Sequence, residues 1–376
     1  MYLSTSSELA EFCEHAASAK VIAVDTEFLR ERTYFPKLCL VQVAAADRIA
    51  AIDPILIDDL SPLVELLGDA TVTKVFHACS QDLEVLLDGL GVSCAPVFDT
   101  QLAAAFLGLR QQISYASLVE SYCGVRLPKA ESLTDWSRRP LDPEQLTYAE
   151  DDVRYLPGIY NRMMHELVER DRLSWVAPEM GRLCDPERLR RDPSEAYLRL
   201  RRAGSLTRRQ LAVAREVCAW REDVAARRDL PRKWVASDEV VVEICKRTPT
   251  SLERLRKIRG TDQISERDAR SLLEAVQKGV GCPPDDCPKI ARHTRPSADT
   301  ESVIDLMYAV LRLVSEQSGV ATQLIATRDD LLEFVQNRDA SPLACGWRWE
   351  LAGATLSRLL EGEVGLTVRE GRLELL

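Results

Sequence analysis

The chain has 376 residues, enough for two or three domains, and its 46% hydrophobic and 29% charged residues are ordinary for a folded soluble protein. No apolar run approaches the roughly 18 residues that a membrane span needs, and the first 18 residues lack the basic start and apolar block of a signal peptide. We therefore expect a cytoplasmic protein with no membrane partner. The 11 cysteines are scattered and odd in number, which argues against a disulfide framework.

The charge is distributed unevenly along the chain. The net charge of −10 argues at first against a nucleic-acid partner, because Lys and Arg normally drive phosphate binding. Residues 199–260, however, carry 17 Lys and Arg against 8 Asp and Glu, which makes this segment near +9 and the rest of the chain near −19. Composition alone leaves two interpretations open: a basic module that contacts nucleic acid, or a solvated helical surface.

Strand and helix signals alternate in the first 170 residues. Short apolar runs predict strands at 21–24, 38–45, 49–52 and 74–76, with the second and third paired. Helical patterns predict helices at 82–88, 100–107 and 117–122 and around 159–170. This mixture predicts an α/β domain with a mixed central sheet flanked by helices.

The remainder of the chain reads as helical, in two parts. Helix signals dominate 206–280, where Pro231, Pro249 and Gly260 separate several helices. A linker at 281–299 is rich in Pro, Asp and Ser, and apolar residues recur with helical period beyond it. The last residues alternate in polarity and predict a short hairpin around Glu370–Gly371. The predicted domains are 1–185, 204–283 and 296–376.

Three residues of the linker at 281–299 raise the alternative of a zinc site. Cys282, Cys287 and His293 lie close together in the sequence. They supply three ligands where a structural zinc site has four, and the Cys-x4-Cys spacing is loose. We therefore favour the linker interpretation.

A pair of acidic residues follows the first predicted strand. Asp25 and Glu27 are two apart, so on a strand their side chains point to the same side. Two such carboxylates repel each other, and partial burial raises their pKa, unless a cation neutralises them. A divalent metal held by oxygen ligands does so. The alternative is an ordinary loop with both acids solvated.

Further acids lie in two later segments. Asp82 falls in the first turn of a predicted helix, where stabilisation of the helix dipole is the common explanation. A second helix should start at Asp142, which is a good N-cap followed by Pro at the first helical position. On that helix Tyr148 and Asp152 are i, i+4 neighbours, and the alternative is a polar flank of an amphipathic helix. Asp151, beside Asp152, competes as a ligand.

Together the three segments resemble the three motifs of the DEDD exonuclease superfamily, in its tyrosine subgroup. Residues 24–28 match motif one, 77–82 match motif two, and Tyr148 with Asp152 match the Tyr-x-x-x-Asp of motif three. The histidine subgroup would need His where this chain has Thr147. The spacing within this resemblance selects Asp152 over Asp151.

The flanking residues resemble ribonuclease D in particular. Residues 26–28 with 38–43 are similar to its first strand pair, and residues 127–129 with 134–141, which contain Asp-Trp-Ser-Arg-Arg-Pro-Leu, are similar to its lead-in to motif three. The resemblance covers about the first 170 residues. It implies a ribonuclease H-like mixed sheet and a 3′→5′ exoribonuclease that releases nucleoside 5′-monophosphates.

The resemblance also implies a mechanism with two divalent ions, Mg²⁺ or Mn²⁺. Asp25, Glu27 and Asp152 would hold the ion on the side of the nucleophile, and Asp25 would bridge to a second ion supported by Asp82. Tyr148 would orient the attacking water and could take its proton if its pKa were lowered. Three further residues are expected to contact the substrate: Phe28, Gln42 and His77.

Residues 206–260 resemble an HRDC domain, a small helical nucleic-acid-binding module. The resemblance rests on Leu206-Thr207, Trp220-Arg221, residues 227–234 and residues 251–260. It favours RNA contact over a solvated surface, with Arg232 and Lys233 as contacting residues. Residues beyond 300 resemble a second, divergent HRDC-like domain by helical pattern and position. The expected fold is thus an α/β exonuclease domain followed by two small all-α domains, in a monomer.

The expected substrate is RNA with a single-stranded 3′ end, since only an unpaired strand can thread into a buried site. Transfer RNA precursors are what the resemblance implies. A 3′→5′ exonuclease acting on single-stranded DNA carries the same acidic motifs and stays an alternative. A catalytically inactive RNA-binding protein is a second, although the chain retains all four acids and the tyrosine.

Overall fold

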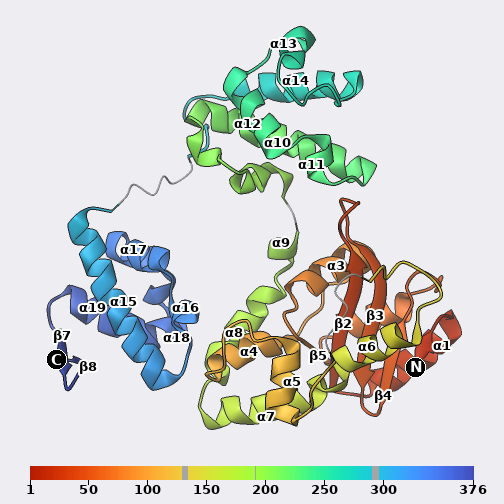
Figure 1. The fold of residues 1–376 in the computed structure, drawn as a ribbon, viewed down its shortest axis with the longest axis vertical. Helices are drawn as coiled ribbons and strands as arrows, with labels where there is room; N and C mark the ends of the chain where they lie inside the picture. Colours follow the sequence, from red (N-terminus) through yellow and green to blue (C-terminus); the bar gives the residue numbers. More distant parts are fainter. Residues whose placement is uncertain (129–133, 191, 290–295) are drawn as a thin grey trace.

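The computed structural model describes residues 1–128, 134–190, 192–289 and 296–376. Along the chain it contains a mixed sheet with its helices, then one helical unit, then a second (Figure 1). The predicted fold class is confirmed in this respect. Lys129 of the lead-in to motif three and His293 lie outside the described residues.

Six strands form one mixed sheet in the order β1-β4-β3-β2-β5-β6. Their bounds are β1 Tyr2–Leu3, β2 Val21–Leu29, β3 Lys37–Ala45, β4 Arg48–Ile52, β5 Thr73–Phe76 and β6 Val97–Asp99. β3 pairs antiparallel with both β2 and β4, whereas β5 lies parallel to β2 and β6. All four predicted strands are present, and the two short edge strands β1 and β6 were not predicted.

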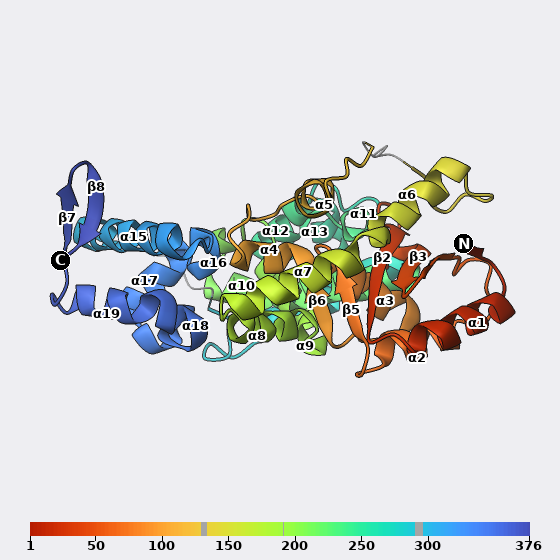
Figure 2. The same ribbon diagram turned by 90° about the horizontal axis from the view of Figure 1, so that it is seen from below.

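Helices cover both faces of this sheet. Their bounds are α1 Ser6–Ala17, α2 Ser61–Gly68, α3 Ser80–Leu90, α4 Thr100–Phe106, α5 Tyr115–Cys123, α6 Pro143–Arg154, α7 Leu156–Glu169 and α8 Leu173–Leu183. One hydrophobic core joins the sheet to α1, α2 and α3, and a second joins its other face to α4, α5, α6 and α7. Figure 2 shows α1 and α2 on one side of the sheet and α6 on the other.

The strand that carries motif one runs further than the sequence predicted. β2 continues from the predicted end, Val24, to Leu29, so Asp25 and Glu27 lie within the strand and not after it. β3 pairs with it along this whole length, through an irregularity between Glu27 and Phe28, whereas β5 pairs with it only as far as Ala23. The two acids therefore extend past the end of β5, where the sheet is open on one side.

The second unit contains α10 Arg208–Arg228, α11 Arg232–Val235, α12 Asp238–Arg247, α13 Leu252–Arg256 and α14 Glu266–Val280. The short helix α9 Pro186–Leu189 precedes this unit and packs against α3 of the exonuclease unit. α10 begins with a capping box in which Thr207 accepts from the backbone of Gln210 and the Gln210 side chain accepts in return. α10 and α14 pack closely at Gly279, where an added Cβ would lie 2.4 Å from the Cα of Val213. Trp220 is buried in this core.

The third unit contains α15 Ala298–Ser318, α16 Thr322–Ile325, α17 Arg328–Gln336, α18 Gly346–Arg348 and α19 Ala354–Leu360. The strands β7 Leu366–Arg369 and β8 Arg372–Leu375 follow as an antiparallel hairpin. The predicted turn is confirmed: Glu370 and Gly371 both have positive φ, 50° and 77°, as a tight hairpin turn requires. This unit is thus helical with a terminal hairpin, and not purely α-helical.

Both helical units contact the exonuclease unit. The loop between β2 and β3 reaches the second unit near α11 (Figure 1), where the Tyr34 hydroxyl donates to Glu222 at 2.7 Å. Asp229, which caps α10, accepts from the backbone N–H groups of Tyr34 and Phe35, each at 3.0 Å. On the other side, Glu179 of α8 accepts from the indole of Trp347 in the third unit.

No helix in the described parts of the chain is long and apolar enough to cross a membrane. Cys282 and Cys287 of the linker are buried against Ala212, and the thiol of each donates to the carbonyl oxygen of Pro283. Within the described ranges, neither Cys282 nor Cys287 belongs to a cluster that could hold a metal. His293, the third candidate ligand, lies outside the described residues, so the linker interpretation stays a prediction.

Candidate metal centre

Three carboxylates from two elements converge beyond the end of β5. Asp25 and Glu27 of β2 and Asp152 of α6 each offer an oxygen, and these oxygens lie within 4.8 Å of one another. Asp25 and Glu27 share a face of the sheet because side chains alternate along a strand. That face also carries Ala23, which contacts the core formed with α6 and α7. The structure thus brings motifs one and three together across the interface between sheet and helix.

The start of α6 fixes the position of its acidic residue. Asp142 and Gln145 form a capping box, and Pro143 occupies the first turn, as predicted. Ala149 and Val153 are fully buried against the sheet, so Asp152 is held at the edge of that contact. Its neighbour Asp151 instead accepts from the Nε of Arg154 at 2.8 Å.

Asp82 approaches the site from the opposite face of the sheet. It lies in the first turn of α3, is 7% exposed, and accepts a hydrogen bond of 2.5 Å from the hydroxyl of Thr26. Thr26 stands between Asp25 and Glu27, so this bond ties motif two to motif one. Asp82 is not within the group of three converging oxygens. It is near enough, however, to raise the pKa of Asp25 by its charge.

The converging carboxylates repel one another, and burial and this repulsion raise their pKa values. Burial, followed by the charges of Asp82, Asp152 and Glu27, raises the pKa of Asp25 well above its usual range. Burial and the neighbouring carboxylates raise the pKa of Glu27 to about 8. Burial raises the pKa of Asp152 to about 7, against a hydrogen bond from Tyr148 that lowers it. Carboxylates in such a cluster gain from a bound cation, which restores their charged forms.

Tyr148 is a half-buried donor. Its hydroxyl hydrogen-bonds Asp152, and burial together with the nearby charges of Asp152 and Glu27 raises its pKa. The sequence analysis allowed Tyr148 to take a proton if its pKa were lowered, and in the metal-free protein that pKa moves the other way. The neutral phenol therefore suits a residue that orients a water molecule by hydrogen bonding.

Gln42 lies beside Asp25 on the neighbouring strand. The two residues are directly paired across β3 and β2, so their side chains share a face of the sheet. Gln42 is fully buried, and among the residues that the structure describes neither its amide nitrogen nor its amide oxygen has a hydrogen-bond partner. A buried amide without partners is costly. This orphaned group next to the carboxylates fits a site that takes up a metal ion with its water.

Two residues predicted to contact substrate are held by the protein. The ring nitrogens of His77 lie 2.9 Å from the hydroxyl of Thr100 and 3.0 Å from the carbonyl oxygen of Ile113. Both nitrogens are thus engaged, and burial lowers the pKa of the ring. Phe28 is partly buried against the core on the α1 side of the sheet. These positions favour a structural role for His77, and the predicted substrate contact of Phe28 stays a prediction.

Several basic side chains of residues 199–260 form ion pairs with acidic residues of their own unit. Arg221 pairs with Asp238, Arg228 with Asp268, and Arg232 donates to the buried Glu222 at 3.2 Å. Lys233 is exposed, and the neighbouring Trp234 is 51% exposed. The two residues predicted to contact RNA therefore have different surroundings. Arg232 bonds Glu222 at the junction with the exonuclease unit, whereas Lys233 faces solvent.

Sequence reasoning gave no role to Thr26, Trp136 or Arg139. Thr26 joins motifs one and two, and Trp136 contacts the ring of Tyr148, with centroids 6.0 Å apart. Arg139 donates to groups on three separate segments. The available signal was the Asp-Trp-Ser-Arg-Arg-Pro-Leu stretch ahead of α6, in which a buried Trp and a multidentate Arg stand together.

Comparison with known proteins agrees with this geometry. Residues 1–168 match the family described as 3′-5′ exonuclease, and residues 210–276 match the HRDC domain. Ribonuclease D of Granulibacter bethesdensis is 38% identical over 100% of this chain and 96% of its own length, and that of Sphingobium indicum is 40% identical over 99% and 97%.

A solved structure matches the whole arrangement. Escherichia coli RNase D, described as an exoribonuclease involved in structured RNA processing, superposes with a TM-score of 0.83 at 34% identity, over 96% of this chain and 98% of that one. Members of this family are 3′→5′ exoribonucleases, and RNA is their substrate. The convergent acids, the exonuclease and HRDC matches and these full-length relatives together show that the chain belongs to the ribonuclease D family.

Proposed function

We propose that this protein removes nucleotides from the 3′ end of RNA by hydrolysis that depends on two divalent ions and releases nucleoside 5′-monophosphates. The observation that carries the proposal is the set of three carboxylate oxygens within 4.8 Å of one another. Oxygen ligands of this kind suit Mg²⁺ or Mn²⁺. When bound, such ions supply positive charge that stabilises the attacking and leaving oxygens of an in-line displacement.

The residues of the chain divide the remaining work. Asp25, Glu27 and Asp152 would hold one ion, and Asp25 would share the other with Asp82. The hydroxyl of Tyr148 orients the attacking water, because its raised pKa keeps it a neutral donor and acceptor. Gln42 is fully buried and its amide makes no hydrogen bond within the described residues, so we propose that it would bond a water of the metal-loaded site and does not contact the nucleotide directly.

The HRDC unit supplies RNA affinity that the acidic exonuclease unit lacks. Lys233 offers a charge for phosphate, and the exposed Trp234 beside it offers a ring on which a base can stack. The bonds from Tyr34 and Phe35 to Asp229 attach this part of the unit to the loop that follows β2. We propose that Lys233 lies along the path of the strand, and that Arg232 chiefly maintains the junction.

Replacing Lys233 with alanine should weaken RNA binding a few-fold and make it less sensitive to salt. For a single strand, losing one phosphate contact lowers the slope of log binding constant against log salt by about 0.7. Filter binding at several salt concentrations, with the metal omitted, measures this. Lys246→Ala is the matched control, because Lys246 is an exposed lysine of the same unit at the end of α12. Equal slopes for Lys233→Ala and the wild type would count against the contact.

Several finer expectations stay proposals. We propose transfer RNA precursors as natural substrates and a monomer as the working form, with domains at 1–185, 204–283 and 296–376. The third unit contacts the exonuclease unit through Glu179, Trp347 and Arg348. The cytoplasmic location expected from the sequence also stays a prediction.

A time course with end-labelled substrates tests the proposed activity. We expect a 5′-labelled RNA with an unpaired 3′ tail to shorten one nucleotide at a time with Mn²⁺, and to stay intact in EDTA. A circular RNA of the same sequence should resist, because it has no 3′ end. Faster shortening of a matched single-stranded DNA would move the function to DNA metabolism. Tight binding of the tailed RNA without shortening of either substrate would leave only an RNA-binding protein.

A further inference from the structure

In the segment that precedes α6, the buried Trp136 packs against Tyr148, the proposed catalytic tyrosine. Trp136 is 8% exposed, and its ring lies 6.0 Å from that of Tyr148, between centroids, at an interplanar angle of 35°. Both belong to a small hydrophobic cluster, separate from the main cores, that also contains Leu40, Ala51 and Ala149. The ring of Tyr148 therefore packs against a residue that lies outside its own helix.

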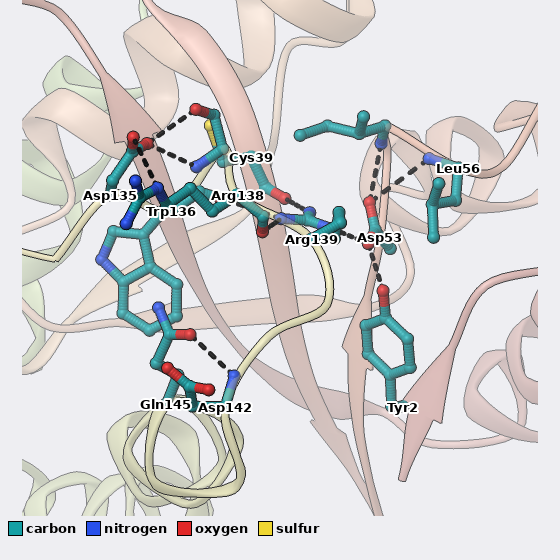
Figure 3. A network of polar contacts seen from close by, with 12 residues as sticks. Tyr2, Cys39, Asp53, Leu56, Asp135, Trp136, Arg138, Arg139, Asp142 and Gln145 are labelled. Carbon is teal, nitrogen blue, oxygen red and sulfur yellow. Dashed lines mark hydrogen bonds and ion pairs between the residues drawn. The ribbon is translucent and has the colours of Figure 1, made fainter.

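Arg139 holds this segment in place. Its Nη1 donates to the carbonyl oxygens of Trp136 and Arg138 at 2.8 and 2.7 Å, and its Nη2 donates to that of Cys39 at 2.8 Å (Figure 3). Its Nε donates to the carboxylate of Asp53. The side chain is only 15% exposed. One planar guanidinium thus joins the Trp136 segment to β3 and to the residue after β4.

The acidic partner of Arg139 is itself fixed. Asp53 is fully buried and accepts from the hydroxyl of Tyr2 and from the backbone N–H groups of Ile55 and Leu56, at 2.9 and 3.3 Å (Figure 3). Burial alone would raise the pKa of Asp53, but its hydrogen bonds with Arg139 and Tyr2 outweigh burial and lower it. Arg139 is therefore anchored to a charged group that cannot shift without breaking several bonds.

The contact with β3 falls next to a proposed metal ligand. In the pairing of β2 with β3, Glu27 faces Leu40 and Phe28 faces Leu38, so Cys39 is the extra residue of a bulge. Arg139 bonds the carbonyl oxygen of this extra residue. Arg139, which supports Trp136, is thus also bonded to β3, the strand that pairs with motif one on β2.

We propose that Arg139 is a positioning residue, which fixes the orientation of Tyr148 through Trp136. The proposal rests on the catalytic role proposed for Tyr148. The tyrosine hydroxyl acts only if it points at the reacting water, and small misplacements of such groups cost about 10- to 100-fold in rate. Lysine cannot replace Arg139, because a single ammonium lacks the planar fork that reaches several carbonyl oxygens and a carboxylate together.

A double-mutant cycle tests this coupling. Arg139→Lys should lower kcat on tailed RNA by about 10- to 100-fold, while KM and the Mn²⁺ concentration for half-maximal rate stay unchanged. In a Tyr148→Phe background, the same change should cost less than about twofold, because the group being positioned is gone. Trp136→Phe should show the same dependence on Tyr148. It serves as the second variant if Arg139→Lys lowers the melting temperature.

Arg256→Lys is the matched control, because Arg256 also donates to two backbone carbonyl oxygens but lies in the HRDC unit. It should leave kcat unchanged. If Arg139→Lys and Trp136→Phe cost as much in the Tyr148→Phe background as in the wild type, the positioning role is overturned. If Tyr148→Phe alone is as active as the wild type, the role proposed for Tyr148 fails first, and the positioning role fails with it.

Discussion

Asp25→Asn should lower the rate of RNA shortening by at least about 1,000-fold while leaving RNA binding in EDTA unchanged. Asp25 feels the negative charge of all three other acids, since Asp82, Asp152 and Glu27 each raise its pKa. Asparagine keeps the shape but removes the charge that would hold both ions. Losing that metal stabilisation of the transition state costs several kcal/mol, and about 4 kcal/mol corresponds to 1,000-fold.

The structure offers a matched control on α6. Asp152→Asn should behave like Asp25→Asn, whereas Asp151→Asn should keep nearly full activity, because Asp151 pairs with Arg154 and not with the converging oxygens. Single-turnover rates with Mn²⁺, together with binding measured in EDTA, separate catalysis from affinity. Equal losses for Asp151→Asn and Asp152→Asn would mean that the proposed ligand set is wrong.

The metal-free protein should be destabilised by its own active site as the pH rises. Glu27 and Asp152 have pKa values raised to about 8 and about 7, and that of Asp25 is raised well above its usual range. An acid whose pKa is higher in the folded state contributes stability below its unfolded pKa, near 4, and loses it as the pH rises through the folded pKa. Between about pH 5 and pH 8 we expect a loss on the order of 6 kcal/mol from this cluster.

Asp152→Asn isolates this effect from titration elsewhere in the chain. In EDTA, the variant should be less stable than or equal to the wild type near pH 5 and more stable near pH 8, as measured by denaturant midpoints. Adding Mn²⁺ should reverse the order at pH 8, because the ion binds the folded wild type and not the variant. A difference between the two proteins that does not change with pH would show that the acids do not repel one another in the folded state.

The sequence revealed the site better than it revealed the strand beneath it. Asp25, Glu27, Tyr148 and Asp152 were proposed because the three segments together resemble the motifs of DEDD exonucleases, whereas their spacing alone left a solvated loop and a polar helix flank as alternatives. The extension of β2 to Leu29 was missed, since charged residues interrupt the apolar run by which a buried strand is recognised. Those charges are the functional exception to the pattern.

Helix α1 was not predicted although a local signal for it is present, whereas the missed contacts have no local signal because their partners are far apart in the sequence. α1 begins with a capping box between Thr5 and Glu8, a local signal that the sequence itself contains. By contrast, Arg139 lies 86 residues from Asp53, and Tyr34 lies 188 residues from Glu222. No periodicity or local motif encodes such pairs, because they depend on how separate elements pack.

The most direct test of the two-ion account is a crystal structure of the protein with Mn²⁺ and a nucleoside 5′-monophosphate, with anomalous scattering recorded at the manganese edge. The account predicts two anomalous peaks, with Asp25 contacting both, Glu27 and Asp152 contacting one, and Asp82 nearest the other. A single peak, or peaks away from Asp25 in crystals that contain the nucleotide, would contradict it.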